Sequence, residues 1–584
     1  MYTLGINAAF HDSSACLVKD GQVLAAAEEE RFTRIKHGKR PIPFSTYELP
    51  FHAMHYCLEE AGIRLQDVEH VAYSYDPALQ RNKTGLQDQS LVLPMEPSAH
   101  PKPEQWDSVW EGLFLSSILN APRHLAGGFP HHLAKRFQGI RFDGPFQWHF
   151  VPHHLAHAAS AFHPSPFVEA AVMTLDGRGE QATTNYGFGK DVSMEILGQV
   201  HMPHSLGMLY EEVTTYLGFL HSSDEYKVMA LASFGKPRYL QEFRDIVQIT
   251  GKGQYRLQPL RLVERLGPER RRGEEFSERH FDIAHSLQKV LEETVLELAH
   301  WLHQETRLPH LCMAGGVALN CVMNARIRDH GPFEDVWVQP AAGDAGTSLG
   351  AALWIDGKER RAQKRSYRMD HVYLGPAFDD EAIEEQLKRS KLSYRKSEHL
   401  AQDVADLLIA DNIVGWFQGR MEFGPRALGS RSILASPLRA EMQARLNDIK
   451  DREDFRPVAP VVLEEEASAW FLNVHVSPFM LFVHDVRPEK APLIPAVCHI
   501  DGTARVQTVN TQQNALYYEL IQAFGQKTGV PVLINTSFNT KGQPIVCTPA
   551  DAVACFYTSP LDVLVMGSFI VTKLRMASGE TRGV

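Results

Sequence analysis

Two histidines four residues apart stand in the segment VPHHLAHAAS, residues 151–160. If this segment is helical, His153 and His157 lie on one face, where both imidazoles can reach the same metal ion. The glutamate that follows the first histidine in zinc proteases is absent, so that chemistry is not indicated. A helix-cap or core role is about as common for such a pair, and these residues alone leave both interpretations open.

A second group of candidate residues lies in the last third of the chain, where arginines stand beside glycine and proline. Guanidinium groups fork onto phosphate or carboxylate oxygens, so a convergent set predicts a site for phosphorylated small molecules. A solvated charged face fits less well, because the flanking residues are apolar or form turns. The candidates are Arg420, Arg426, Arg431, Lys450, Arg452, Arg456, Arg505, Asn535, Ser537 and Asn539.

Four turns follow predicted strands or open predicted helices: the polar NAAFHDSS and the glycine-rich DGRGE, AGGVALN and GDAGTSLG. Glycine lets backbone N–H groups approach phosphate oxygens, and a helix N-terminus favours negative charge. Each turn alone is weak evidence, because chain geometry makes such turns common. Their order is more specific, since a meander with a polar first turn, a strand ending in DGxG and a strand–GG–helix is typical of the actin-like ATPase fold.

In that layout, Asp176 would hold a metal–phosphate group, and the nucleotide would lie close to the backbone of Gly177, Gly315 and Gly316. Asp344 would lie in a turn near the nucleotide. Two neutral imidazoles and one carboxylate then form an open site suited to iron(II) or zinc, with magnesium accompanying ATP. The alternative is that the two histidines cap a strand and Asp344 caps a helix.

The elements that must position these residues follow from the hydrophobic periodicity. TLGIN, SACLV and QVLAAAEEE, with an Asp20-Gly21 turn, predict a three-stranded meander. AAVMTL and TTNYGFG predict strands, and apolar residues from Ile283 to Leu302 recur at helical spacing. Further on, NIVGWFQGR and VPVLINTSFN predict strands, DAVACFYTS a helix and LDVLVMGSFIVTK a strand pair. The fold class is therefore α/β.

The same pattern predicts two domains. We expect an N-terminal actin-like domain over 1–355, a charged linker over 356–372 and a second α/β domain over 373–584. A solvated helix face is an equal alternative for the linker. No internal repeat is visible, and residues 80–150 and 238–275 are too irregular to receive a role.

Composition narrows the class of protein. The 584 residues carry a net charge of −11, which disfavours nucleic acid as a partner. The seven cysteines contain no CxxC pair, which argues against a disulfide framework. No signal peptide and no apolar run of about 20 residues is seen, so no membrane partner is expected and the cytoplasm is the expected location.

The chain resembles the O-carbamoyltransferase family of antibiotic-tailoring and nodulation-factor enzymes over nearly its whole length. The ordered motifs that carry the resemblance are FHDSSA, AEEERFTRIKHG, HHLAHAASAF, LDGRGE, SLGMLYEEVT, GDAGTSLGAA, GRMEFGPRALGSRSIL, KDREDFRPVAP and NTSFNTKGQPIV. The resemblance implies an N-terminal domain similar to the tRNA threonylcarbamoyltransferase subunit. It also implies a C-terminal domain similar to threonylcarbamoyl-adenylate synthase.

The family resemblance also implies a mechanism. The second domain would convert ATP and carbamoyl phosphate into carbamoyl adenylate and pyrophosphate, using Arg426, Lys450, Arg456, Arg505, Asn535 and Ser537. The first domain would pass the carbamoyl group to a hydroxyl, with His11 as general base and a metal at His153, His157 and Asp344. Asp12, Lys36 and Arg456 are expected to be catalytic together with His11, and Lys36 could bind phosphate. Asn320 and Lys227 are expected to bind substrate or nucleotide. His11 could instead stabilise a turn, and Lys36 could be a surface lysine.

The acceptor stays open. Some family members carry extra residues, one of them acidic, ahead of FHD, whereas NAAFHD is shorter and apolar. A hydroxylated natural product is expected, from classes that include aminoglycosides, macrolides, ansamycins, cephems, lipochitooligosaccharides and peptide-like antibiotics. A homodimer is an option. The competing functions are a fused tRNA threonylcarbamoylation enzyme and a non-enzymatic actin-like ATP-binding regulator.

Overall fold

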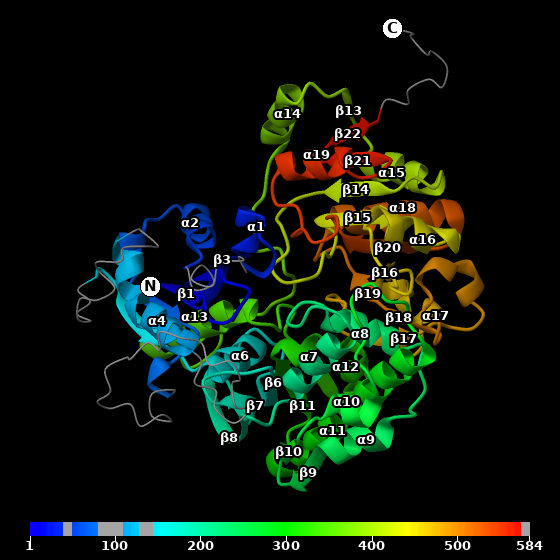
Figure 1. Ribbon diagram of the computed structural model, residues 1–584. Helices are drawn as coiled ribbons and strands as arrows, with labels where there is room; N and C mark the ends of the chain where they lie inside the picture. Colours follow the sequence, from blue (N-terminus) through cyan, green and yellow to red (C-terminus); the bar gives the residue numbers. More distant parts are fainter. Residues whose placement is uncertain (39–48, 80–108, 128–143, 574–584) are drawn as a thin grey trace. The chain divides into compact units, whose positions relative to one another are not determined.

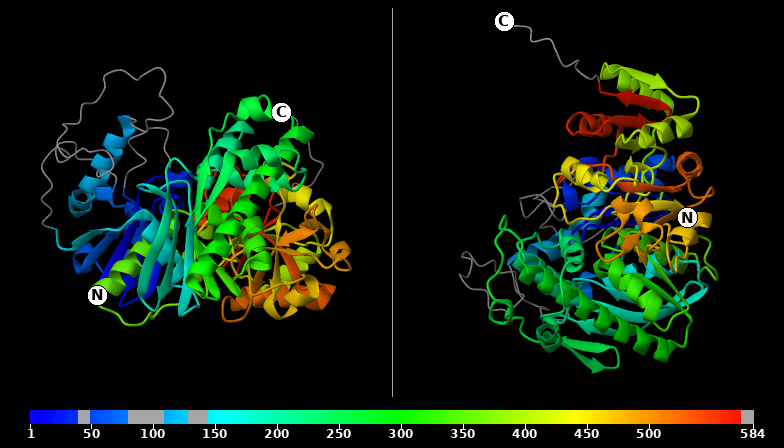
Figure 2. Two further views of the ribbon diagram at one scale, coloured as in Figure 1. Left: turned by 90° about the horizontal axis from the view of Figure 1, so that it is seen from below. Right: turned by 90° about the vertical axis from the view of Figure 1, so that its right-hand side faces the viewer.

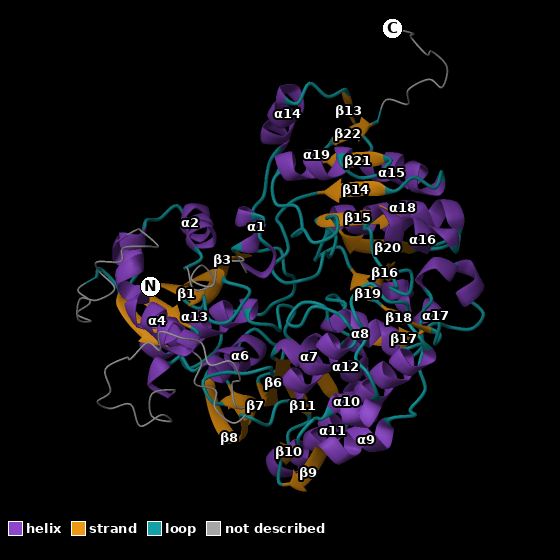
Figure 3. Cartoon of the chain, viewed as in Figure 1, coloured by secondary structure: helices purple, strands orange, loops and turns teal. Residues whose placement is uncertain are grey.

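The computed structural model describes residues 1–38, 49–79, 109–127 and 144–573 (Figure 1). The chain divides into two compact units. Unit 1 is Met1–Leu374 with Phe423–Pro425, and unit 2 is Gly375–Glu422 with Arg426–Val584. Both units mix helices and strands, which confirms the α/β prediction (Figure 3). Among the described residues, no helix combines the length and apolar character that a membrane span requires.

Unit 1 begins with the predicted meander. Its first sheet has the order β3-β2-β1-β4-β5, with β1 to β3 antiparallel and β4 and β5 added in parallel. Asp20 and Gly21 both have positive φ, 49° and 82°, as the tight turn between β2 and β3 requires. The strands are β1 (Tyr2–Asn7), β2 (Ser14–Lys19), β3 (Gln22–Glu28), β4 (His70–Tyr73) and β5 (Gln147–Phe150).

A second sheet in unit 1 repeats this topology. Its order is β12-β11-β6-β7-β8, in which β6 to β8 form the antiparallel meander and β11 and β12 run parallel to β6. The two halves share backbone topology without a repeat that is visible in the sequence. The strands are β6 (Glu169–Leu175), β7 (Ala182–Lys190), β8 (Ser193–His201), β11 (His310–Ala314) and β12 (Asp335–Val338).

A helix follows the fifth strand of each sheet, α6 (His153–Phe162) after β5 and α13 (Ala345–Glu359) after β12. The two helices pack so closely that a Cβ on Gly350 would lie 1.9 Å from the carbonyl oxygen of Ala156. Only glycine fits there. Two meander sheets with paired helices confirm the actin-like architecture that the motif order predicts. The first four residues of the predicted linker, 356–359, belong to α13.

Further helices complete unit 1, and α11 contains the predicted stripe from Ile283 to Leu302. Part of the irregular region 80–150 lies outside the described residues, whereas 238–275 holds α9, β9, β10 and α10. The elements are α1 (Glu30–Thr33), η1 (Lys36–Gly38), α2 (Phe51–Glu60), α4 (Val109–Gly127), α7 (Leu206–Tyr216), α8 (Glu225–Ala232), α9 (Leu240–Ile246), β9 (Val247–Gly251), β10 (Gln254–Leu257), α10 (Leu262–Leu266), α11 (Glu278–Thr306) and α12 (Cys321–His330).

Unit 2 is built on an eight-stranded mixed sheet of order β13-β22-β21-β14-β15-β20-β16-β19. Its helices and strands are the yellow-green to red ribbons of Figure 2. Trp416 and Phe417 of β14 belong to two different core clusters, one with α15 and α18 and the other with α16 and α19. Consecutive strand residues point to opposite faces, so helices cover both faces of this sheet. The strands predicted from NIVGWFQGR and VPVLINTSFN are β14 and β20, and the last strand pair is β21 and β22.

The elements of unit 2 have the following bounds. The strands are β13 (Tyr394–Lys396), β14 (Val414–Phe417), β15 (Arg431–Ala435), β16 (Ala459–Leu463), β17 (Val483–Asp485), β18 (Thr503–Arg505), β19 (Gln507–Val509), β20 (Val532–Ser537), β21 (Val563–Met566) and β22 (Phe569–Thr572). The helices are α14 (Asp380–Arg389), α15 (Leu400–Ile409), α16 (Glu441–Ile449), α17 (Ala467–Trp470), α18 (Ala515–Thr528) and α19 (Pro549–Tyr557).

Candidate functional site

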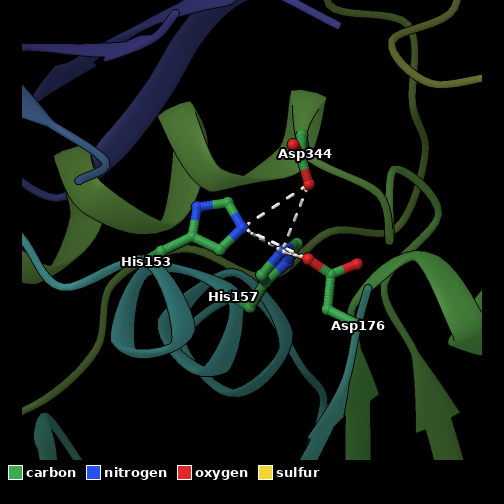
Figure 4. Close-up of side chains that lie close together, drawn as sticks. All are labelled: His153, His157, Asp176 and Asp344. Carbon is green, nitrogen blue, oxygen red and sulfur yellow. Dashed lines mark hydrogen bonds and ion pairs between the residues drawn. The ribbon is translucent and has the colours of Figure 1, made fainter. Parts of the chain in front are cut away.

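Two histidines and two aspartates of unit 1 converge on one point (Figure 4). His153 and His157 lie one turn apart on α6, Asp176 follows β6, and Asp344 precedes α13. All four side chains are buried, with exposed fractions of 8% or less. The structure thus brings together the three predicted metal ligands and adds Asp176, which the sequence placed beside a metal–phosphate group.

The spacing of the ligand atoms suits a divalent cation. The two Nε2 atoms of His153 and His157 lie 3.1 Å apart. Their distances to Asp344 Oδ1 are 3.5 and 3.6 Å, and those to Asp176 Oδ2 are 3.3 and 3.5 Å. Ligands about 2.1 Å from an ion are separated by about 3.0 Å at right angles and about 3.4 Å at tetrahedral angles. The observed separations match the edges of such a coordination shell.

The hydrogen bonding of the cluster also suits a cation. His153 Nδ1 lies 3.2 Å from the carbonyl oxygen of Ser74, so it carries the proton and leaves the Nε2 lone pair facing the cluster. Both carboxylate oxygens of Asp344 are buried and accept no hydrogen bond from the described residues, although Asp344 stands at the N-cap of α13. A capping carboxylate would accept a backbone N–H. Asp344 faces the imidazoles instead, and the capping alternative fails.

The pKa values of the clustered side chains are shifted by burial and by their neighbours. Burial would lower the pKa of His153, but the carboxylates of Asp344 and Asp176 hold that pKa well above its ordinary value. Burial would raise the pKa of Asp344, yet the neighbouring His11 and His153 lower it to about 2. Without a cation, the cluster therefore holds a proton on His153 beside ionised carboxylates. A bound cation would replace that proton and leave the Nε2 lone pair as a ligand. A ligand set of two imidazoles and two carboxylates fits Fe(II) or Zn²⁺ and does not distinguish them.

The predicted catalytic loop after β1 lies beside this cluster. His11 Nδ1 is 3.8 Å from Asp344 Oδ2 and 2.9 Å from Asp12 Oδ2. The loop after β1 and the loop after β6, which carries Asp176, are equivalent in the duplicated topology. Lys36 begins the short turn η1, and its side chain makes no hydrogen bond or ion pair within the described residues.

The glycine-rich turns support Asp176. The N–H of Gly316 donates to Asp176 Oδ1 at 2.8 Å, which leaves Oδ2 for the histidines. Gly315 has φ of 95°, and a Cβ there would lie 2.1 Å from the carbonyl oxygen of Leu175. Gly177 is packed against Gly207, whose own Cβ would meet the Gly177 nitrogen at 2.7 Å. These glycines allow the close chain approaches that place Asp176.

Two of the predicted nucleotide residues make contacts elsewhere in unit 1. Asn320 Oδ1 caps α12 by accepting the N–H of Met323 at 2.9 Å, and its Nδ2 donates to Gln288 at 2.8 Å. Lys227 Nζ lies 3.2 Å from Asp224 and above the ring of Phe219. Neither contact reaches the histidine cluster, so the nucleotide-binding role of both residues stays a prediction.

The six residues of unit 2 that the resemblance assigns to carbamoyl-adenylate formation gather at one edge of its sheet, where strands end. β20 is antiparallel to β15 and β16, and β19 is parallel to β16. The carboxyl end of β20 therefore lies beside the amino ends of the other three strands. Asn535 and Ser537 belong to that end of β20, and Lys450 Nζ donates to Ser537 Oγ at 2.9 Å. Arg426, Arg456 and Arg505 each stand a few residues ahead of β15, β16 and β19, respectively.

Further contacts tie this edge together. Asn535 Nδ2 donates to the carbonyl oxygen of Ala427 at 3.1 Å and to Gln507 Oε1 at 2.7 Å, which holds the residue after Arg426 at the end of β20. Arg456 Nη1 lies 3.6 Å from Glu453. Arg431 differs, because it is fully buried, donates to carbonyl oxygens that include that of Gln418 at 2.8 Å, and stacks on Phe417. It supports the fold and is not placed to bind a ligand.

Three supporting residues escaped the sequence analysis. Glu180 accepts the N–H of His153 at 2.9 Å and so fixes the start of α6. His37 contacts Asp12 at 2.8 Å, and Gln507 contacts Asn535. Glu180 closes the DGRGE motif and His37 follows Lys36, so both stand within recognised motifs. Their contacts join segments far apart in the chain, which no local pattern reveals.

Comparison with known families assigns the chain. Residues 2–353 match the model of the carbamoyltransferase N-terminus, and residues 405–573 match that of the carbamoyltransferase C-terminus. The N-terminal model covers most of unit 1, which holds the buried His/Asp cluster. The C-terminal model covers most of unit 2, which holds the basic sheet edge. The chain belongs to the carbamoyltransferase family.

Several proteins of known sequence are similar to this chain over most of their own length. Nodulation protein NolNO of Sinorhizobium fredii is 40% identical over 98% of this chain and 80% of its own. Nodulation protein NolO of Bradyrhizobium diazoefficiens is 41% identical over 72% of this chain and 78% of its own. Protein sll1178 of Synechocystis is 40% identical over 99% of this chain and 98% of its own. Full-length HypF, solved with phosphate and nucleotide, aligns with a TM-score of 0.34, 13% identity and coverage of 62% of this chain and 56% of its own.

Proposed function

We propose that the protein is an ATP-dependent O-carbamoyltransferase that works through carbamoyl adenylate, with one half-reaction in each unit. The observation that carries the proposal is the buried cluster of His153, His157, Asp176 and Asp344, with His11 beside it, in a carbamoyltransferase chain. The cationic and amide side chains at the sheet edge of unit 2 supply the second part of the argument.

In unit 2, the activated carbamate would form. Water releases phosphate from carbamoyl phosphate, and an oxygen of the resulting carbamate attacks the α-phosphorus of ATP and displaces pyrophosphate. Arg426, Arg456 and Arg505 would neutralise the anionic oxygens, and Mg²⁺ would accompany ATP. Lys450 is suited to hold Ser537 and Asn539, because its Nζ donates to both side chains at 2.9 and 2.8 Å.

In unit 1, the carbamoyl group would pass to an acceptor hydroxyl. His153, His157, Asp176 and Asp344 would hold the divalent metal, which as a Lewis acid favours attack at the carbamoyl carbon. His11 would take the proton of the acceptor hydroxyl, since a neutral imidazole is suited to that transfer near neutral pH. The hydroxyl oxygen bonds to the carbamoyl carbon, and AMP leaves with the bridging oxygen.

The partners proposed are ATP, carbamoyl phosphate and a hydroxylated natural product, with no nucleic acid and with homodimer formation open. Two of the relatives are named as nodulation proteins, which supports a small-molecule acceptor over tRNA. The seven cysteines are all free thiols, which supports a reducing compartment such as the cytoplasm.

Incubation with ATP, carbamoyl phosphate, Mg²⁺ and Fe²⁺ or Zn²⁺, followed by mass spectrometry, tests the proposal. The expected product is carbamoyl adenylate, and a panel of hydroxylated natural products should contain one that gains a carbamoyl group. Adenylate formation that requires threonine and bicarbonate would instead indicate tRNA threonylcarbamoylation. ATP binding without pyrophosphate release would indicate a regulator.

A further inference from the structure

Asp12 lies between two imidazoles. Its Oδ2 is 2.9 Å from His11 Nδ1, and its Oδ1 is 2.8 Å from His37 Nδ1. A carboxylate only accepts hydrogen bonds, so both imidazoles donate to it through Nδ1. Burial would raise the pKa of Asp12, but His37 and His11 hold it well below its ordinary value, which keeps both acceptor oxygens charged. With Nδ1 as the donor, a neutral His11 carries its lone pair on Nε2.

His37 is itself held by several contacts. Its backbone N–H donates to Glu30 Oε2 at 2.6 Å, its carbonyl oxygen accepts the N–H of Asp12 at 3.1 Å, and its Nε2 lies 3.1 Å from Ser223 Oγ. Asp12 and His37 both adopt left-handed backbone conformations, with φ of 49° and 61°. Residues other than glycine rarely adopt this conformation, and they keep it where the surroundings enforce it. The contacts of His37 with Glu30, Asp12 and Ser223 hold this segment in that conformation.

Asp12, Glu30 and His37 could be considered as a second cation site, since their ligand atoms lie close together. Their hydrogen bonds argue against it. Glu30 Oε1 forms an ion pair with Arg31 at 2.8 Å, and Glu30 Oε2 accepts the backbone N–H of His37. His37 Nδ1 donates to Asp12. The group is a hydrogen-bonded support in which the donors and acceptors already match.

We propose that His37 is a positioning residue for carbamoyl transfer: it anchors Asp12, and Asp12 in turn orients the imidazole of His11 toward the acceptor. The proposal rests on the proposed function, in which His11 is the general base. A base oriented by a carboxylate is effective because one tautomer and one ring orientation are held. His37 adds the second anchor. Without it, the carboxylate of Asp12, whose side chain is 26% exposed, could rotate away from His11.

Two substitutions at His37 distinguish a role in positioning Asp12 from a role in stabilising the fold. His37→Gly removes the imidazole at no backbone cost, since glycine adopts positive φ freely. His37→Asn also tolerates positive φ and keeps an N–H donor near the place of Nδ1. Ser223→Ala is the matched control, because it removes the outer partner of His37 and leaves the contact with Asp12.

The experiment measures carbamoyl transfer and carbamoyl-adenylate formation separately, with the metal-loaded full chain. For His37→Gly, kcat of transfer should fall by about tenfold or more at an acceptor KM within about twofold, because orientation acts on the chemical step. His37→Asn should recover most of kcat, Ser223→Ala should retain it, and adenylate formation should be unchanged in all three. A crystal structure of His37→Gly should show Asp12 no longer within hydrogen-bond distance of His11 Nδ1.

The proposal is overturned if His37→Gly keeps the wild-type kcat, if His37→Asn is as impaired as His37→Gly, or if Asp12 stays in place without His37. Absence of carbamoyl adenylate in the wild-type reaction would instead refute the proposed function. In that case the crystal structure of His37→Gly still decides whether His37 positions Asp12.

Discussion

Replacement of Asp344 by asparagine tests the proposed metal site quantitatively. The carboxylate is 1% exposed and accepts no hydrogen bond within the part of the chain that the structure describes. Its Oδ1 lies 3.5 and 3.6 Å from the two imidazole Nε2 atoms. Asp344→Asn keeps the shape of the side chain and removes one of two ligand charges. A 100-fold weaker metal affinity, about 2.7 kcal/mol, is the expected order of magnitude, since changes outside the ligand shell already cost 10- to 100-fold.

The assay compares unfolding of each protein with and without metal. At a metal concentration about 100 times the wild-type Kd, binding stabilises the native state by about 2.7 kcal/mol. The variant, whose Kd would then equal the metal concentration, gains only about 0.4 kcal/mol. Each protein is compared with its own chelated form, so any effect of the substitution on the metal-free protein cancels.

Asp356→Asn is the matched control. Asp356 lies on α13, the helix that Asp344 precedes. It is also 1% exposed, and it pairs with Arg360 at 2.7 Å, away from the cluster. Its substitution should leave the metal-induced stabilisation unchanged. The reasoning is refuted if Asp344→Asn binds the metal as tightly as the wild type, or if both variants lose affinity equally.

Three further predictions follow from the two units. Arg456→Ala should abolish carbamoyl-adenylate formation, whereas His11→Ala should preserve it and stop the mass gain of the acceptor. Arg431→Met should lower the free energy of unfolding in urea by about 3 kcal/mol, because buried carbonyl oxygens lose their donor. Burial lowers the pKa of His154 and of His163 to about 3. As the pH falls, these histidines take up protons in the unfolded chain near pH 6.5 and in the folded chain only near pH 3. The free energy of unfolding should therefore fall below pH 6.5 by up to about 1.4 kcal/mol per pH unit for each histidine. The fall should be smaller in His163→Gln.

Local patterns predicted much of this molecule. The Asp20-Gly21 turn and the alternation around it predict the meander, and the spacing of His153 and His157 predicts two ligands on one helix face. These features depend on residues a few positions apart, where the strand and helix periods act directly. The basic edge of unit 2 was also visible, because each motif stands at a strand end.

Other features depend on contacts that the chain makes over long distances. The duplicated topology is hidden because the elements from α7 to α11 separate β8 from β11 in the second half. Asp176 reaches the histidines through the packing of β6 beside α6, and Asp12 meets His37 through two left-handed residues. Arg431 shares its flanking pattern with Arg426, and only its burial shows that it is structural.

The central claim is that ATP is cleaved at its α-phosphorus to activate a carbamoyl group. Incubation of the metal-loaded protein with ATP labelled with ³²P at the α-phosphate, with and without carbamoyl phosphate, tests this claim most directly. Label is expected in carbamoyl adenylate and AMP, and only when carbamoyl phosphate is present. Label in ADP, or AMP formed at the same rate without carbamoyl phosphate, would contradict it.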